Sequence, residues 1–128
     1  MTNAPTTRHA RLERKSFTNP DATRAPDKTI VELLALGGTE IGRYTFEPGW
    51  KWSECIKPVV GTESCRTEHL GYCIAGTLHC ALDDGTELHI AAGDAYFIPA
   101  GHDGWVVGDE PAVLIEFNGA SGYARPPS

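Results

Sequence analysis

Short apolar segments, each ended by glycine or proline, are the feature that most restricts the fold of this chain. No segment keeps a helical period long enough to form a long amphipathic helix. Short, regularly spaced segments with such turn residues between them are typical of antiparallel sandwiches and barrels. We therefore expect an all-β domain, with strands at residues 29–36, 41–46, 69–75, 77–82, 86–91, 94–99, 104–108 and 112–117.

The hairpin over residues 77–91 makes a prediction about its own turn. The apolar residues of its two strands, Leu78, Cys80 and Leu82 on one and Leu88 and Ile90 on the other, face the same side only if the loop has an odd number of residues. We therefore predict a three-residue turn at residues 83–85 with Gly85 at positive φ. This register places His79 across from His89. The two rings form either a surface metal chelate or an ordinary polar pair.

Composition excludes several classes of function. The 128 residues fit one domain, and the net charge of −6 with a pI near 5.2 leaves no basic surface for nucleic acid or an anionic membrane. No apolar run reaches the ~20 residues of a membrane-spanning helix, and no secretory signal is recognisable. We expect a cytoplasmic protein whose cysteines, none of them in a C-x-x-C pair, are thiols.

The two ends of the chain differ from its centre. Residues 1–27 are polar, contain Pro5, Pro20 and Pro26, and show no sustained period. We expect a flexible N-terminal arm there, a barrel domain over residues 28–120, and a C-terminal tail over residues 121–128.

The stretch GDAYFIPAGH, residues 93–102, has the spacing G-x5-P-x-G at Gly93, Pro99 and Gly101. This spacing resembles the second motif of the cupin superfamily, whose members are small double-stranded β-helix, or jelly-roll, barrels. The family has a histidine three residues after the last glycine, where this chain has Gly104. His102 has the same strand parity and can face the interior from one step earlier.

The stretch GTESCRTEHLGYCIAG, residues 61–76, resembles the first cupin motif, G-x5-H-x-H-x3,4-E-x6-G. Counting back from Gly76, His69 stands at the family's glutamate, Cys65 at its second histidine and Glu63 at its first. All three positions share strand parity, so a strand would aim them into one cavity. The motif is in frame but has different residues.

The resemblance implies a metal site made of Cys65, His69 and His102. A thiolate with imidazoles favours a divalent transition metal, zinc first, with iron or copper as alternatives. Glu63 would be a further ligand or a catalytic group. Two other interpretations stay open: a cupin that has lost its metal site, and a metal-free thiolate–imidazole pair of Cys65 and His69.

A tryptophan-rich segment precedes this motif. In FEPGWKWSECIKP, residues 46–58, Trp50 and Trp52 share parity with Glu54, which predicts an aromatic wall with one carboxylate that acts as a catalytic base. Trp105 and Tyr96 would complete a substrate-binding wall. The alternatives are that the aromatic residues fill the core and that Glu54 is a solvated loop residue.

The last expected strand, residues 112–117, has no assigned function, and we expect Val113, Ile115 and Phe117 on its half-buried face.

Three hypotheses follow for the function. The first is a metal-dependent enzyme acting on a small organic molecule inside the barrel. The second is a non-enzymatic cupin that binds or senses a small molecule, and the third is a redox-active thiol protein. A homodimer is expected because cupins are frequently homodimers.

Overall fold

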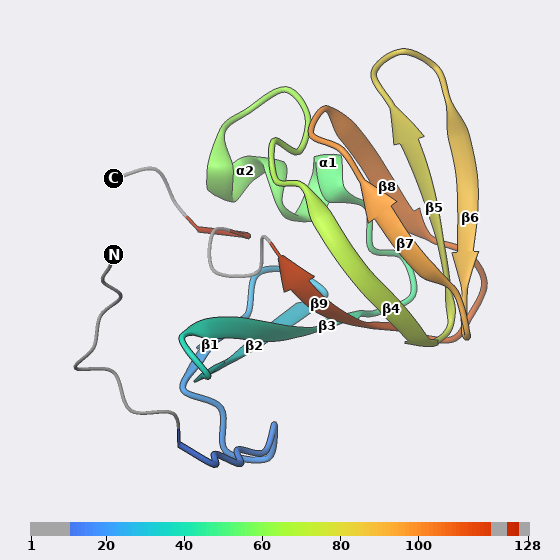
Figure 1. Ribbon diagram of the computed structural model, residues 1–128. Helices are drawn as coiled ribbons and strands as arrows, with labels where there is room; N and C mark the ends of the chain where they lie inside the picture. Colours follow the sequence, from blue (N-terminus) through green and yellow to red (C-terminus); the bar gives the residue numbers. More distant parts are fainter. Residues whose placement is uncertain (1–10, 119–122, 126–128) are drawn as a thin grey trace, which may run out of the picture.

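A computed structural model describes residues 11–118 and 123–125 of the protein. It contains two antiparallel sheets (Figure 1). One sheet has the strand order β1-β2-β3-β9-β4-β7 and the other the order β6-β5-β8. The all-β jelly-roll expectation is confirmed. The elements are β1 (Ala22–Arg24), β2 (Thr29–Leu36), β3 (Thr39–Phe46), α1 (Trp52–Cys55), α2 (Lys57–Val60), β4 (His69–Ala75), β5 (Thr77–Leu82), β6 (Glu87–Ala91), β7 (Ala95–Ile98), β8 (His102–Val106) and β9 (Ala112–Asn118).

Strand alternation separates the core from the surface. In β4, His69, Gly71 and Cys73 are buried, while the residues between them are exposed. A single apolar cluster contains inward-facing residues of both sheets, among them Tyr44 of the large sheet and Cys80 of the small one. The two sheets therefore pack on each other through one core.

β9, the last strand, lies inside the large sheet, where it pairs with both β3 and β4. Gly71 lies opposite Glu116 in this arrangement. A Cβ atom at Gly71 would lie 2.6 Å from the hydroxyl of Tyr96. The glycine therefore leaves the room in which Tyr96 and Glu116 approach each other.

The interpretation of β9 was wrong about its faces. Ala112, Leu114 and Glu116 are the buried residues, whereas Phe117 is exposed. The inner face of this strand therefore contains a carboxylate. A count of apolar side chains alone predicts that the opposite face is the inner one.

Both expected ends contain ordered structure. Within the expected arm, β1 pairs with β2, although its side chains stay outside the buried core. Within the expected tail, Tyr123 and Ala124 are buried, and Arg24 Nη1 donates a hydrogen bond to the carbonyl of Tyr123 at 2.7 Å. The remaining parts of the two predictions, residues 1–10, 119–122 and 126–128, lie outside the described residues.

All four cysteines are free thiols, as expected, and all four are buried. No helix in the described part of the chain has the length and apolar character that crossing a membrane requires.

The hairpin of β5 and β6 has the predicted register. His79 pairs with His89, and Leu82 N–H donates to Thr86 O at 2.8 Å, which leaves residues 83–85 as the turn. Gly85 has φ +93°.

We predict that Gly85→Val lowers the free energy of unfolding by about 1 kcal/mol or more, because a β-branched residue is strained at positive φ. The surrounding space is open, since a Cβ atom at this position would meet no other atom within 4 Å, so the cost is one of backbone conformation alone. Urea denaturation measures it. Gly85→Asn is the control and should cost less, since asparagine tolerates this region; equal stability of the two variants would contradict the prediction.

Candidate metal centre

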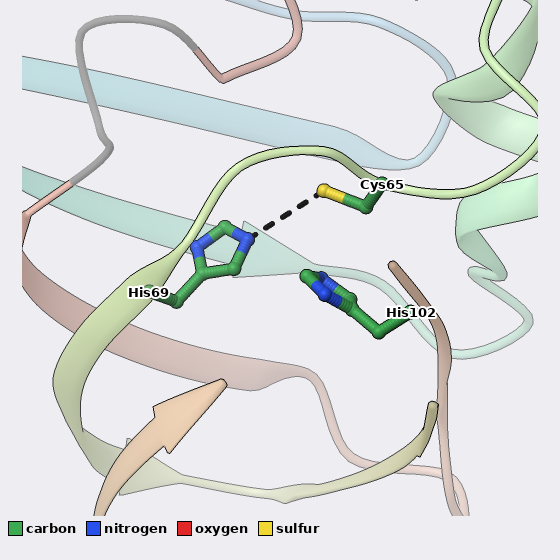
Figure 2. Close-up of side chains that lie close together, drawn as sticks. All are labelled: Cys65, His69 and His102. Atoms are coloured by element: carbon green, nitrogen blue, oxygen red, sulfur yellow. Dashed lines mark hydrogen bonds between the residues drawn. The ribbon is translucent and has the colours of Figure 1, made fainter. Parts of the chain in front are cut away.

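Cys65, His69 and His102 converge in the core. One potential ligand atom from each lies within 4.8 Å of the other two, and all three residues are buried. Figure 2 shows the three side chains pointing toward one another, Cys65 and His69 from one continuous segment and His102 from another. No other group of three such residues meets this criterion among the described residues. The structure thus brings the three predicted ligands together.

Backbone hydrogen bonds hold Cys65 beside His102. Cys65 N–H donates to the carbonyl of His102 at 2.8 Å, and Gly101 N–H donates to the carbonyl of Cys65 at 2.7 Å. This isolated bridge fixes the loop before β4 against the start of β8. His69 is the first residue of β4 and brings the third side chain to the same point.

A buried carboxylate orients His69. The Nδ1–H of His69 donates to Glu116 Oε1 at 2.6 Å, and the hydroxyl of Tyr96 donates to Glu116 Oε2 at 2.6 Å. Because Nδ1 carries the proton toward the carboxylate, Nε2 faces Cys65 Sγ, at 3.6 Å. A histidine held by a carboxylate in this way is the usual arrangement of a metal-ligating imidazole.

A backbone carbonyl orients the second imidazole. His102 Nδ1 lies 2.7 Å from Pro99 O, and a carbonyl can only accept, so Nδ1 is the donor. Nε2 of His102 is therefore left for the cluster. The edge-to-face rings of His69 and His102 have their centroids 5.1 Å apart.

The charges of the metal-free cluster are coupled. Burial disfavours the thiolate, but hydrogen bonding to His102 and His69 outweighs burial and lowers the pKa of Cys65 to about 6. Burial also disfavours the imidazolium, yet hydrogen bonding to Cys65 and Glu116 raises the pKa of His69 to about 9. Without a metal, the pair is a thiolate and an imidazolium between these two values.

The donor set fits a transition metal. One sulfur and two ring nitrogens are soft or borderline ligands, which suit zinc, copper or iron, whereas magnesium and calcium prefer oxygen. Three protein ligands leave a coordination position open for a small molecule. A ligating histidine also needs a partner that fixes its tautomer and ring orientation, and both imidazoles have such a partner at Nδ1.

Aromatic residues form a cavity next to the cluster. Its free space is about 20 Å³, room for about one water molecule. A second, outer cleft of about 220 Å³ lies against it, with Cys65 on its wall. Trp52 and Tyr123 line both spaces, so they form the partition between them.

The predicted aromatic residues divide into three groups. Trp50 and Trp52 line the inner cavity, as expected. Tyr96 is buried but does not line the cavity, and its hydroxyl donates a hydrogen bond to Glu116. Trp105 lies on the other face of β8 and stacks on His79 with ring centroids 4.4 Å apart, outside the cavity.

The structure does not bring the two predicted catalytic carboxylates to the cluster. Glu54 is exposed because residues 52–55 form helix α1, where a strand-type parity does not apply. Glu63 belongs to a loop and its side chain is 91% exposed, with Lys57 Nζ at 3.3 Å. Residues 63, 65 and 69 therefore do not lie on one strand, as their shared parity had suggested, because β4 begins only at His69.

Three residues of the site were missed in the sequence: Tyr44, Glu116 and Tyr123. A signal existed for Glu116, since it shares parity with Ala112 and Leu114 on a strand that is apolar on both faces. No local pattern marked Tyr123, because its burial depends on the tail packing against Tyr44, with ring centroids 4.7 Å apart.

Comparisons with known proteins agree with this architecture. The family model of the cupin domain matches residues 43–118. A search of curated protein sequences gave no match.

Solved structures share the fold at low sequence identity. A protein of unknown function from Rhizobium leguminosarum bv. viciae has a TM-score of 0.61 at 14% identity, covering 85% of this chain and 98% of that one. A variant of oxalate decarboxylase from Bacillus subtilis has a TM-score of 0.57 at 16% identity, and the match covers 91% of this chain and 32% of that one. The polyketide cyclase RemF from Streptomyces resistomycificus has a TM-score of 0.54 at 18% identity, and the match covers 83% of this chain and 79% of that one. At these identities the likeness extends to the fold alone.

We predict that metal-free protein forms a thiolate with a midpoint near pH 6, because the two histidines stabilise the charged form of Cys65. The thiolate is present above this pH and is protonated below it. Ultraviolet absorbance of the thiolate measures the titration. Cys65→Ser should remove the step, whereas Cys80→Ser should keep it, since burial raises the pKa of Cys80 to about 11. A first titration step only in the range of an ordinary thiol would contradict the prediction.

Proposed function

The chain belongs to the cupin family, and from that premise we propose that it is a metal-dependent enzyme acting on a small organic molecule bound beside Cys65, His69 and His102. Zinc is the metal we propose first, with iron or copper as alternatives. Enzymes occur among the structures with this fold, namely oxalate decarboxylase and a polyketide cyclase.

The observation that carries the proposal is the orientation of the two imidazoles. Glu116 and the carbonyl of Pro99 each accept an Nδ1–H, so both Nε2 atoms are directed to the space that Cys65 Sγ also reaches. A core histidine satisfied by one partner needs no such convergence with a second histidine and a thiol. The cluster is therefore better explained as a ligand set than as core packing.

A divalent metal in this site would polarise a substrate oxygen or activate a bound water. The residues of the chain would supply the remaining functions. Cys65 would hold the metal as a thiolate, His69 and His102 would hold it as neutral imidazoles, and Glu116 would keep the Nδ1 proton of His69 in place. The aromatic walls exclude bulk water from the open position, which strengthens electrostatic interactions there.

A small-molecule-binding cupin without turnover is the second candidate. The observation that favours it is the small inner cavity, about 20 Å³, which leaves room for little more than a single atom of substrate next to the cluster. In that case the cluster would hold a metal or a ligand and the outer cleft would do the binding.

We predict that untagged protein purified after zinc supplementation contains about one metal ion per chain, and that His69→Ala abolishes this content. Elemental analysis measures it. His89→Ala is the matched control: His89 lies 4.7 Å from His79, ring to ring, but outside the cluster, so its loss should leave the metal content unchanged. Unchanged metal in His69→Ala would refute the proposed site.

We also predict that Glu116→Gln weakens metal affinity by roughly 10- to 100-fold, because the amide no longer holds the His69 tautomer and ring as a carboxylate does. Competition with a chromophoric chelator measures the affinity. Affinity should also fall on acidification, since protons compete for Cys65 and His69. Glu63→Gln, whose side chain is exposed, is the control; an equal effect of both substitutions would contradict the role of Glu116.

A further inference from the structure

We infer the chemical class of the ligand, an inference that rests on the proposed function. We propose that the outer cleft and inner cavity together bind a small organic carboxylate that carries a second, hydrogen-bond-accepting oxygen. The carboxylate would lie at the mouth of the cleft, and the second oxygen would lie beside the cluster.

Three buried polar atoms in the cavity wall have no protein partner among the described residues. They are the hydroxyl of Tyr44 and the indole Nε1 atoms of Trp50 and Trp52. Their side chains are only 1–3% exposed, so bulk water does not satisfy them. Indole N–H groups can only donate, and an unsatisfied buried donor is costly. The cavity therefore lacks an acceptor, which a ligand oxygen would supply.

The size of the inner cavity limits what can enter it. About 20 Å³ admits a group of the size of one water molecule, such as a carbonyl oxygen. The body of the ligand then lies in the outer cleft, which is about ten times larger. Trp52 and Tyr123 line both spaces, so a ligand reaching from one to the other passes between them.

The outer cleft has two cationic side chains on its wall in a chain of net charge −6. Its described lining contains Arg66 and Arg125 and no acidic residue. Arg66 forms an exposed ion pair with Asp83, in which Asp83 Oδ2 lies 3.9 Å from Arg66 Nη2, beyond hydrogen-bonding distance. Asp83 already accepts from Ser64 Oγ at 2.9 Å. The guanidinium of Arg66 thus keeps donors free for an anionic ligand.

The test uses three small probes on the full-length chain. They are 4-oxopentanoate, its amide, and pentanoate, which separate the negative charge from the inner oxygen. Binding is followed by the indole N–H resonances of the three tryptophans. Trp105, on the outer face of β8 and stacked on His79, serves as an internal control.

We predict that 4-oxopentanoate shifts the resonances of Trp50 and Trp52 but not that of Trp105. The amide and pentanoate should each bind about fivefold more weakly, the effect expected of one partly exposed charge contact or one hydrogen bond. Arg66→Gln should bring the acid to the affinity of the amide and leave the amide unaffected. Arg11→Gln, at an exposed residue outside the cleft, should change neither.

Equal affinities of acid and amide, an absence of shifts at Trp50 and Trp52, or a shift of Trp105 alone would overturn this inference. The result is independent of the metal analysis. A chain that binds metal but shows no preference for the carboxylate keeps the proposed function and loses the ligand class. A chain that shows the preference but binds no metal keeps the ligand class and becomes a small-molecule-binding module.

Discussion

The contact between His69 and Glu116 is the interaction on which the rest of the site depends. A carboxylate that is 1% exposed would be strongly destabilising without partners, and it has two, the imidazole of His69 and the hydroxyl of Tyr96. The same contact fixes which nitrogen of His69 faces Cys65. It therefore joins the stability of the core to the chemistry of the cluster, because neither residue can be changed without affecting both.

This contact also explains features of the surrounding sheet. Glu116 reaches His69 only because β9 lies between β3 and β4, and Tyr96 reaches Glu116 only because Gly71 has no side chain. Tyr44 and Tyr123 then close the aromatic wall, and the ring of Tyr123 lies edge-on to His69 at 5.4 Å. Tyr123 thus contributes to the site although it lies outside the two cupin motifs.

The sequence predicted the features that depend on local pattern. Glycine and proline between short apolar segments predicted the all-β fold, and the alternation of the hairpin strands predicted the turn at Gly85. The motif spacing predicted that Cys65, His69 and His102 lie together. Features that depend on long-range packing were missed. Glu54 is exposed because Trp52–Cys55 is a helix, and the two donors that stabilise the buried Glu116 come from other strands, β4 and β7.

X-ray absorption spectroscopy of the zinc-loaded protein tests the central claim most directly. The account predicts one sulfur scatterer together with imidazole scattering from two histidines, and loss of the sulfur contribution in Cys65→Ser. A zinc environment made only of oxygen and nitrogen in the unmodified protein would contradict it, because the metal would then lie outside the cluster of Cys65, His69 and His102.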